Sequence, residues 1–108
     1  MGKIKVVNST RKTKEVYKLD YQYPIDYDWS TEEIVDVIAY FQQLEKAYDK
    51  GVVKEELLAS YRRFKEIVPG KAQERKICDE FEEVSGFSSY QTLKTAKEKN
   101  AGEILKMK

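Results

Sequence analysis

The sequence contains no histidine among its 108 residues, and its one cysteine is Cys78. Histidine is the commonest general base and zinc ligand, so its absence removes Ser-His and Cys-His nucleophile pairs and argues against an enzyme. A single cysteine excludes an intrachain disulfide, which suits a reducing cytoplasm. Because Asp79 and Glu80 are acidic neighbours that raise a thiol pKa, we predict that Cys78 is a small, buried or half-buried hydrophobe without redox function.

Glycine and proline are also scarce, with five and two residues, and long apolar runs are absent. Few tight turns are therefore available, which favours long elements over many short strands. No stretch reaches the roughly 18 apolar residues that a membrane span needs, and the amino terminus lacks the apolar region of a signal peptide. We therefore expect a cytoplasmic protein with no membrane partner. The net charge of +1 provides no strong field of either sign.

What the sequence does contain is 41% hydrophobic and 36% charged residues, which is typical of a globular chain with large solvated helix surfaces. The clearest element begins after Ser30, an N-cap residue that Glu33 follows three positions later to complete a capping box. Trp29 precedes the cap and is placed to pack on Ile34 as a hydrophobic staple. Apolar residues then recur at steps of three and four, which predicts a helix over about 31–50. Its inward positions are Ile34, Val37, Ile38, Phe41, Leu44 and Tyr48.

Three further segments show the same helical spacing. They cover about 53–68, 71–84 and 88–99. Pro69-Gly70 and Gly86 separate them, and Ser88 is the expected N-cap of the last one. The residues expected to point inward are Leu57, Tyr61, Phe64 and Val68, then Ile77, Phe81 and Val84, then Tyr90, Leu93 and Ala96. We predict an all-α fold, a compact array of three to four amphipathic helices preceded by an extended aromatic segment.

The two ends of the chain are expected to differ from this helical body. Residues 1–20 carry six basic and two acidic residues and predict a basic arm, weakly ordered or folded as a small hairpin. Residues 21–100 are assigned to a single helical domain, because 108 residues are too few for two cores. Residues 101–108 are a C-terminal tail that is too short for a structural assignment.

The stretch DYQYPIDYDWSTEEI, residues 20–34, concentrates aromatic and acidic side chains ahead of the first helix. In one interpretation these side chains form an exposed surface that binds a partner. Its members are Tyr23, Asp26, Tyr27 and Trp29. In the other, the rings close one end of a small core, which we favour for Tyr23 and Trp29. The spacing of the carboxylates matches no calcium loop, so we expect neither a metal nor a cofactor.

A basic and aromatic run lies in the second predicted helix. Arg62, Arg63 and Lys65 alternate with rings, a combination that nucleic-acid-binding elements also use. Helical spacing puts Tyr61 and Phe64 on the buried stripe and the cations elsewhere, so rings and charges do not share a face. We favour a solvated helix face with ion pairs. The alternative is a nucleic-acid- or ribosome-associated protein that uses this region together with the basic arm.

Four strings occur in the order YPIDYDWSTEEIVDVIAYF, EKAYDKGV, YRRFKEIVPGKA and FEEVSGFSSY. Together they closely resemble the YktA-like family of small uncharacterised proteins from low-GC Gram-positive bacteria, over about residues 21–97. The resemblance implies a cytoplasmic, all-helical protein and transfers no catalytic or binding residue. It also implies a serine where this chain has Gly70, which would weaken the cap of the third helix.

The sequence therefore favours a non-catalytic protein-interaction module, which binds an unknown protein partner or a second copy of itself as a homodimer. Nucleic-acid association ranks second, and an enzyme ranks third. The residues available to such an enzyme are Asp26, Glu33, Tyr61 and Lys65. They would have to line a shared concave pocket, and no catalytic residue is assigned.

Overall fold

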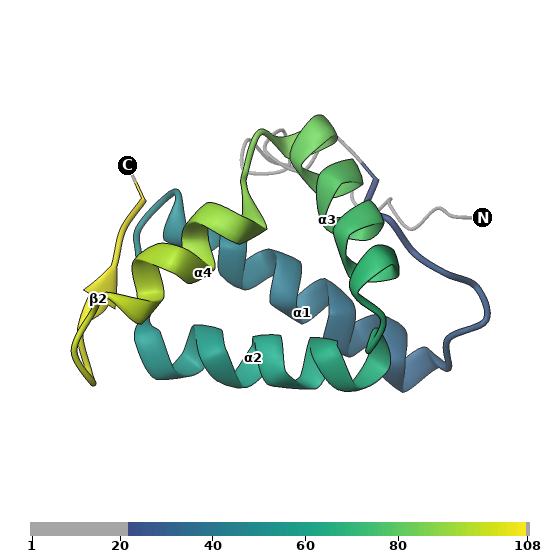
Figure 1. The fold of residues 1–108 in the computed structure, drawn as a ribbon, viewed down its shortest axis with the longest axis horizontal. Helices are drawn as coiled ribbons and strands as arrows, with labels where there is room; N and C mark the ends of the chain where they lie inside the picture. The colour runs from purple at the N-terminus through teal and green to yellow at the C-terminus, as the bar shows by residue number, and fades with distance from the viewer. Residues whose placement is uncertain (1–21, 108) are drawn as a thin grey trace, which may run out of the picture.

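A computed structural model describes residues 22–107, which form four α-helices and one two-stranded antiparallel sheet (Figure 1). The helices are α1 Thr31–Ala47, α2 Lys54–Ile67, α3 Lys71–Ser85 and α4 Ser89–Lys97, and the strands are β1 Val52–Val53 and β2 Ile104–Leu105. The prediction of a mostly helical fold is confirmed. The predicted basic arm of residues 1–20 lies outside the described part of the chain. No helix within residues 22–107 is long and apolar enough to cross a membrane.

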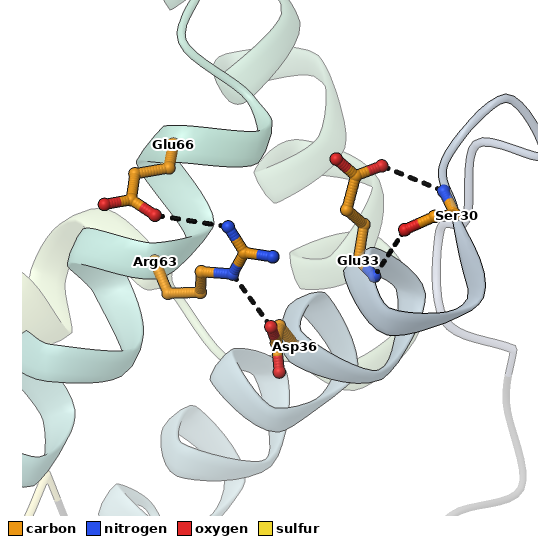
Figure 2. Close-up of polar contacts among 5 residues, drawn as sticks. All are labelled: Ser30, Glu33, Asp36, Arg63 and Glu66. Atoms are coloured by element: carbon orange, nitrogen blue, oxygen red, sulfur yellow. Dashed lines mark hydrogen bonds and ion pairs between the residues drawn. The ribbon is translucent and has the colours of Figure 1, made fainter.

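The first helix begins at the capping box that the sequence predicts (Figure 2). The Ser30 hydroxyl accepts a hydrogen bond from the Glu33 amide at 3.1 Å, and the Glu33 carboxylate accepts one from the Ser30 amide at 2.9 Å. A cap of this kind stabilises a helix by about 1 kcal/mol. The predicted end at residue 50 is wrong, because the chain leaves the helix after Ala47 and turns through 48–50 into Gly51, whose φ is +104°.

The pair formed by α1 and α2 contains most of the core, and the two helices run in opposite directions along each other (Figure 1). The buried residues of these helices are Val37, Tyr40, Phe41, Leu44 and Ala47 on α1, and Leu57 and Phe64 on α2. The predicted stripe is right at Val37, Phe41 and Leu44 and wrong at its other positions. Tyr40 is fully buried although it was not predicted, whereas Ile34, Ile38 and Tyr48 stay partly exposed. The prediction assumed one apolar stripe, whereas α1 contacts α2, α4 and β1 and buries the positions that face them.

The C-terminal residues close the end of this pair, where the sequence predicted only a tail. Val52 lies opposite Leu105 in the short sheet, and Leu105 is completely buried. The Met107 amide donates a hydrogen bond to the Ala47 carbonyl at 2.7 Å. A strand of two residues is too short to show a period in the sequence, so its pairing partner across the fold determines it.

The third helix stands steeply to α2 (Figure 1) and joins the core through Ile77 and Phe81, while its Glu74 accepts hydrogen bonds from Tyr61 and Lys65 on α2. Phe81 is fully buried and stacks on Phe41, with 4.4 Å between the ring centroids. Gly86 ends α3 with a φ of +84°, as its sequence position predicts. Val84, which was predicted to point inward, is 47% exposed instead.

The fourth helix begins after the predicted cap, since the Ser88 hydroxyl accepts from the Gln91 amide at 3.0 Å. Its inward face differs from the prediction, because Tyr90 is 70% exposed while Ser89 and Thr92 are buried. Both buried hydroxyls have hydrogen-bond partners, which removes most of the cost of burying them. A prediction based on hydrophobicity alone therefore placed Tyr90 in the core, although Ser89 and Thr92 are the residues that are buried there.

Candidate functional site

Two hollows of the described surface border α3. One, the segment hollow, has a volume of about 340 Å³ and is formed by residues 24–28 and by α3. The other, the α4 hollow, has a volume of about 570 Å³ and lies between α3 and the start of α4. Each is lined by one well-exposed tyrosine, Tyr27 at 73% in the first and Tyr90 at 70% in the second.

The rings predicted to close the core behave as that interpretation requires. Tyr23 stacks on Phe41 and Phe81 with centroid distances of 5.9 and 6.1 Å, and its hydroxyl donates to a Glu45 carboxylate oxygen at 2.8 Å. Burial and the nearby Glu45 charge raise the pKa of Tyr23 well above its ordinary value. Trp29 also packs against the core. Two of the four aromatic-segment candidates thus contribute to packing.

The other two candidates lie in a turn that presents a ring to solvent. The Asp26 side chain accepts a hydrogen bond from the Asp28 amide at 2.9 Å, and the Asp26 carbonyl accepts one from the Trp29 amide at 3.0 Å. These bonds shape the turn, and Tyr27 between them points into water. Within residues 22–107 no three metal-ligating side chains gather.

The basic region of α2 consists of Arg62, Arg63 and Lys65, of which the first is exposed. Arg63 donates to Asp36 on α1 at 2.8 Å and to Glu66 at 3.2 Å (Figure 2), and these bonds raise the pKa of its guanidinium. Lys65 donates to Glu74 at 2.8 Å. The cations at 63 and 65 thus link α2 to α1 and α3, and each has a carboxylate beside it that lowers its attraction for phosphate.

The four residues considered for an enzyme do not line one pocket. Asp26 lines the segment hollow, and Glu33 is used in the cap of α1. Tyr61 and Lys65 both bind Glu74, with the Tyr61 hydroxyl donating at 2.8 Å. The arrangement that the enzyme hypothesis requires is therefore not formed by these side chains.

The floor of the α4 hollow carries neutral polar groups. Ser89 is buried there, and its hydroxyl lies 2.6 Å from that of Tyr40. Burial raises the pKa of Tyr40 well above its ordinary value and raises that of the Cys78 thiol to about 11. The thiol is half-buried, as the sequence predicts, and it keeps its proton at neutral pH. Neither group can act as a base toward the Ser89 hydroxyl under those conditions.

The rim of the α4 hollow carries the charges and the exposed ring. Lys71 and Arg75 stand on the first half of α3, and Asp79 and Glu82 stand on the second half. The sequence did not predict this surface, because its helical spacing assigned Tyr90 to the core. The signal available in the sequence was the separation of charge in KAQERKICDEFEEVS, where the bases precede most of the acids.

Comparisons with known proteins place most of the chain within one group. The model of the uncharacterised protein family UPF0223 matches residues 20–105. UPF0223 protein YktA of Bacillus subtilis is 62% identical over 86 residues, which cover 80% of this chain and 98% of the relative. A UPF0223 protein of Bacillus velezensis is 58% identical over 89 residues, covering 82% and 100% of the two chains. One from Oceanobacillus iheyensis is 55% identical over 86 residues, covering 80% and 98%.

Proposed function

The chain belongs to the UPF0223 family, and from that premise and its surface we propose that it is a non-catalytic protein-interaction module of the bacterial cytoplasm. The proposal rests on features of the described surface. The surface we assign to partner binding comprises α3, the two hollows that flank it, and the tyrosines at 27 and 90.

The observation that carries this proposal is the exposure of Tyr27 and Tyr90. Among residues 22–107 every other aromatic side chain is buried or half-buried, yet these two are 73% and 70% exposed and lie beside the hollows. A tyrosine ring has a large apolar area with a polar tip, and tyrosine is enriched at protein interfaces and among their energetic hot spots. Two exposed rings beside concave surfaces are therefore suited to packing against a partner.

Other contacts support protein binding over catalysis or nucleic-acid association. The α4 hollow is lined by the protonated Cys78 thiol and by Ser89, whose hydroxyl is hydrogen-bonded to the protonated, fully buried Tyr40. Neither the thiol nor the tyrosine is activated for chemistry at neutral pH. Around α2, Arg63 and Lys65 are hydrogen-bonded to carboxylates. A phosphate-binding surface would instead need those cations to be available to the ligand.

Site-specific photo-crosslinking tests the proposal, because it captures whichever protein lies against the chosen side chain. Benzoylphenylalanine replaces Tyr90 in the full chain, which is expressed in a Bacillus host and irradiated in intact cells. The control places the same residue at Lys97, which is exposed at the end of the same helix. We expect discrete protein adducts from position 90 and none from position 97. No adduct at position 90, or equal adducts at both positions, would contradict the proposal.

A further inference from the structure

The charges of α3 are separated into two halves. The first half, 71–76, holds three bases, Lys71, Arg75 and Lys76, and one acid. The second half, 77–85, holds no base and four acids. Those acids are Asp79, Glu80, Glu82 and Glu83. The helix therefore has a positive and a negative end, and most of its charged side chains are exposed.

This order of charges is the reverse of what an isolated helix favours. The dipole of a helix attracts acids to its N-terminus and bases to its C-terminus, and α1 follows that rule with Glu32 and Glu33 in its first turn and Lys46 in its last. The pairs within α3, Arg75–Asp79 at 3.9 Å and Lys76–Glu80 at 4.0 Å, are long and solvent-exposed, so they contribute little. The stability of the monomer does not account for the charge order of α3.

The reversed order does make the helix complementary to its own copy. In a two-fold symmetric dimer each contact occurs twice, so two antiparallel α3 helices bring the positive half of each onto the negative half of the other. Lys71, Arg75, Asp79 and Glu82 follow one another at steps of four, four and three, which places them on one face of α3. All four also line the α4 hollow, so that face is open on the described surface.

The exposed ring lies on the same face. Tyr90 lines the α4 hollow together with these four residues and Cys78 at the middle of α3. A fifth charged residue of the lining, Glu74, is paired with Lys65 of α2. A two-fold axis near the middle of α3 would bring the α4 hollows of both copies together. The rings at position 90 would then lie near the axis and be covered by the partner, with the charges around them.

We propose that the partner of this surface is a second copy of the chain, which pairs its α3 helix antiparallel to the first around Tyr90, with Arg75 of each copy facing Glu82 of the other. The inference rests on the proposed function and deepens it by naming the partner. An interface of one helix and one ring from each copy is small, so the dimer dissociates on dilution.

Charge reversal at two exposed positions tests the pairing. Arg75→Glu puts acids at both contacts of a homodimer, and Glu82→Arg puts bases at both, so each variant should self-associate about a hundredfold more weakly than the original chain. An equimolar mixture of the two variants restores opposite charges at both contacts and should form a heterodimer. Sedimentation equilibrium over a concentration series should give twice the 12.7 kDa monomer mass for the original chain and for the mixture.

The controls separate pairing from folding. Both changed side chains are exposed, and both new charges agree with the helix dipole, so circular dichroism should show an unchanged fold. Arg62→Glu and Glu98→Arg reverse exposed charges on α2 and after α4, and should leave self-association unchanged.

Two results would overturn the dimer. One is an original chain that stays monomeric at every concentration, and the other is a mixture that associates no better than either variant alone. If the chain is monomeric while position 90 still crosslinks to a different protein, the dimer fails and the proposed interaction function stands. If no adduct forms at position 90 and the chain is monomeric, both fail.

Discussion

The α1–α2 pair and α3 are held in the molecule in different ways. The pair packs along its length, is linked by the Arg63–Asp36 ion pair and is closed at one end by the β1–β2 sheet. The third helix is joined mainly through the buried rings and side chains around Phe81 and Ile77, and both described hollows border it.

This difference separates a region that is arranged for stability, the α1–α2 pair, from a region whose surface is available for binding, α3. In the α1–α2 pair, the charges cap helices or join them, and the rings are packed. In α3, the charge order opposes the helix dipole and the adjoining rings at 27 and 90 face water. A stable pair of helices permits a neighbouring helix that is poorly arranged for its own stability, because the cost is small beside the core.

Truncation of Phe41 is expected to have the largest effect, because its ring connects the two regions. It stacks on Phe81 at 4.4 Å and contacts Phe64 at 6.0 Å. Phe41→Ala should lower the free energy of unfolding by about 3–5 kcal/mol, measured by urea denaturation.

The matched truncation Phe81→Ala tests whether α3 unfolds separately from the α1–α2 pair. Hydrogen exchange of this variant should show loss of protection mainly in α3, with the amides of α1 and α2 still protected. Equal loss of protection in all three helices would show that α3 is not a separable region.

The next effect is expected at the turn between α1 and β1, which lies against the C-terminal strand β2. A Cβ on Gly51 would lie 2.8 Å from Ile104 Cγ2 and 3.2 Å from the Leu105 carbonyl oxygen, and the φ of +104° is strained for other residues. Gly51→Ala should destabilise the protein by about 2–4 kcal/mol in thermal or urea unfolding. The control Gly102→Ala has a φ of +84° and no neighbour within 4 Å, so it should cost only about 1–2 kcal/mol. Equal losses of stability in both variants would show that the close approach of Ile104 and Leu105 to residue 51 is not the cause.

A smaller effect on stability is expected from the titration of the Cys78 thiol, which lies on the face of α3 that borders α4. Burial raises the pKa of Cys78 from 9.0 to about 11, so the native state favours the neutral thiol. The contribution of this thiol to the free energy of unfolding is fully present below about pH 9. As the pH rises to about 11, this contribution falls by about 2 kcal/mol. Urea unfolding across this range should show a steeper decline for the original chain than for Cys78→Ala, since the tyrosines titrate in both. Parallel declines would mean that the thiol is not buried against α4.

The smallest effect is expected at the first turn of α3. Gly70 is its N-cap residue, makes no side-chain cap bond and has no heavy atom within 4 Å of a Cβ position. Gly70→Ser should stabilise the protein by a few tenths of a kcal/mol, because the new hydroxyl can accept from an amide of the first turn. Thermal unfolding measures the gain in stability. An unchanged or lower midpoint would show that the amides of the first turn of α3 do not need a side-chain partner at position 70.

The sequence predicted those features that depend on neighbouring residues. Ser30 and Glu33 are three positions apart, and the two hydrogen bonds of their capping box need no other part of the chain. The stop at Gly86 is equally local, and this glycine has a positive φ. Such features depend on backbone geometry within one turn.

Features that depend on distant partners could not be predicted in this way. Tyr40 and Tyr90 are the same residue type on helical patterns, but Tyr40 is buried because Ser89 on another helix accepts or donates a hydrogen bond to its hydroxyl. Leu105 is buried because Val52 pairs with it. The charges of the candidate surface are visible in the sequence of α3, but only the fold shows that Tyr90 accompanies them.

The pairing of Val52 with Leu105 also determines the order in which a newly synthesised chain can fold. When the nascent chain has emerged from the ribosome through α3, most of the core rings are available, yet the strand that pairs ahead of α2 is still inside the exit tunnel. We expect nascent chains to stay sensitive to protease until residue 105 has emerged, and then to become resistant in one step. Chaperones would therefore meet this protein with its first two helices complete and one end still open.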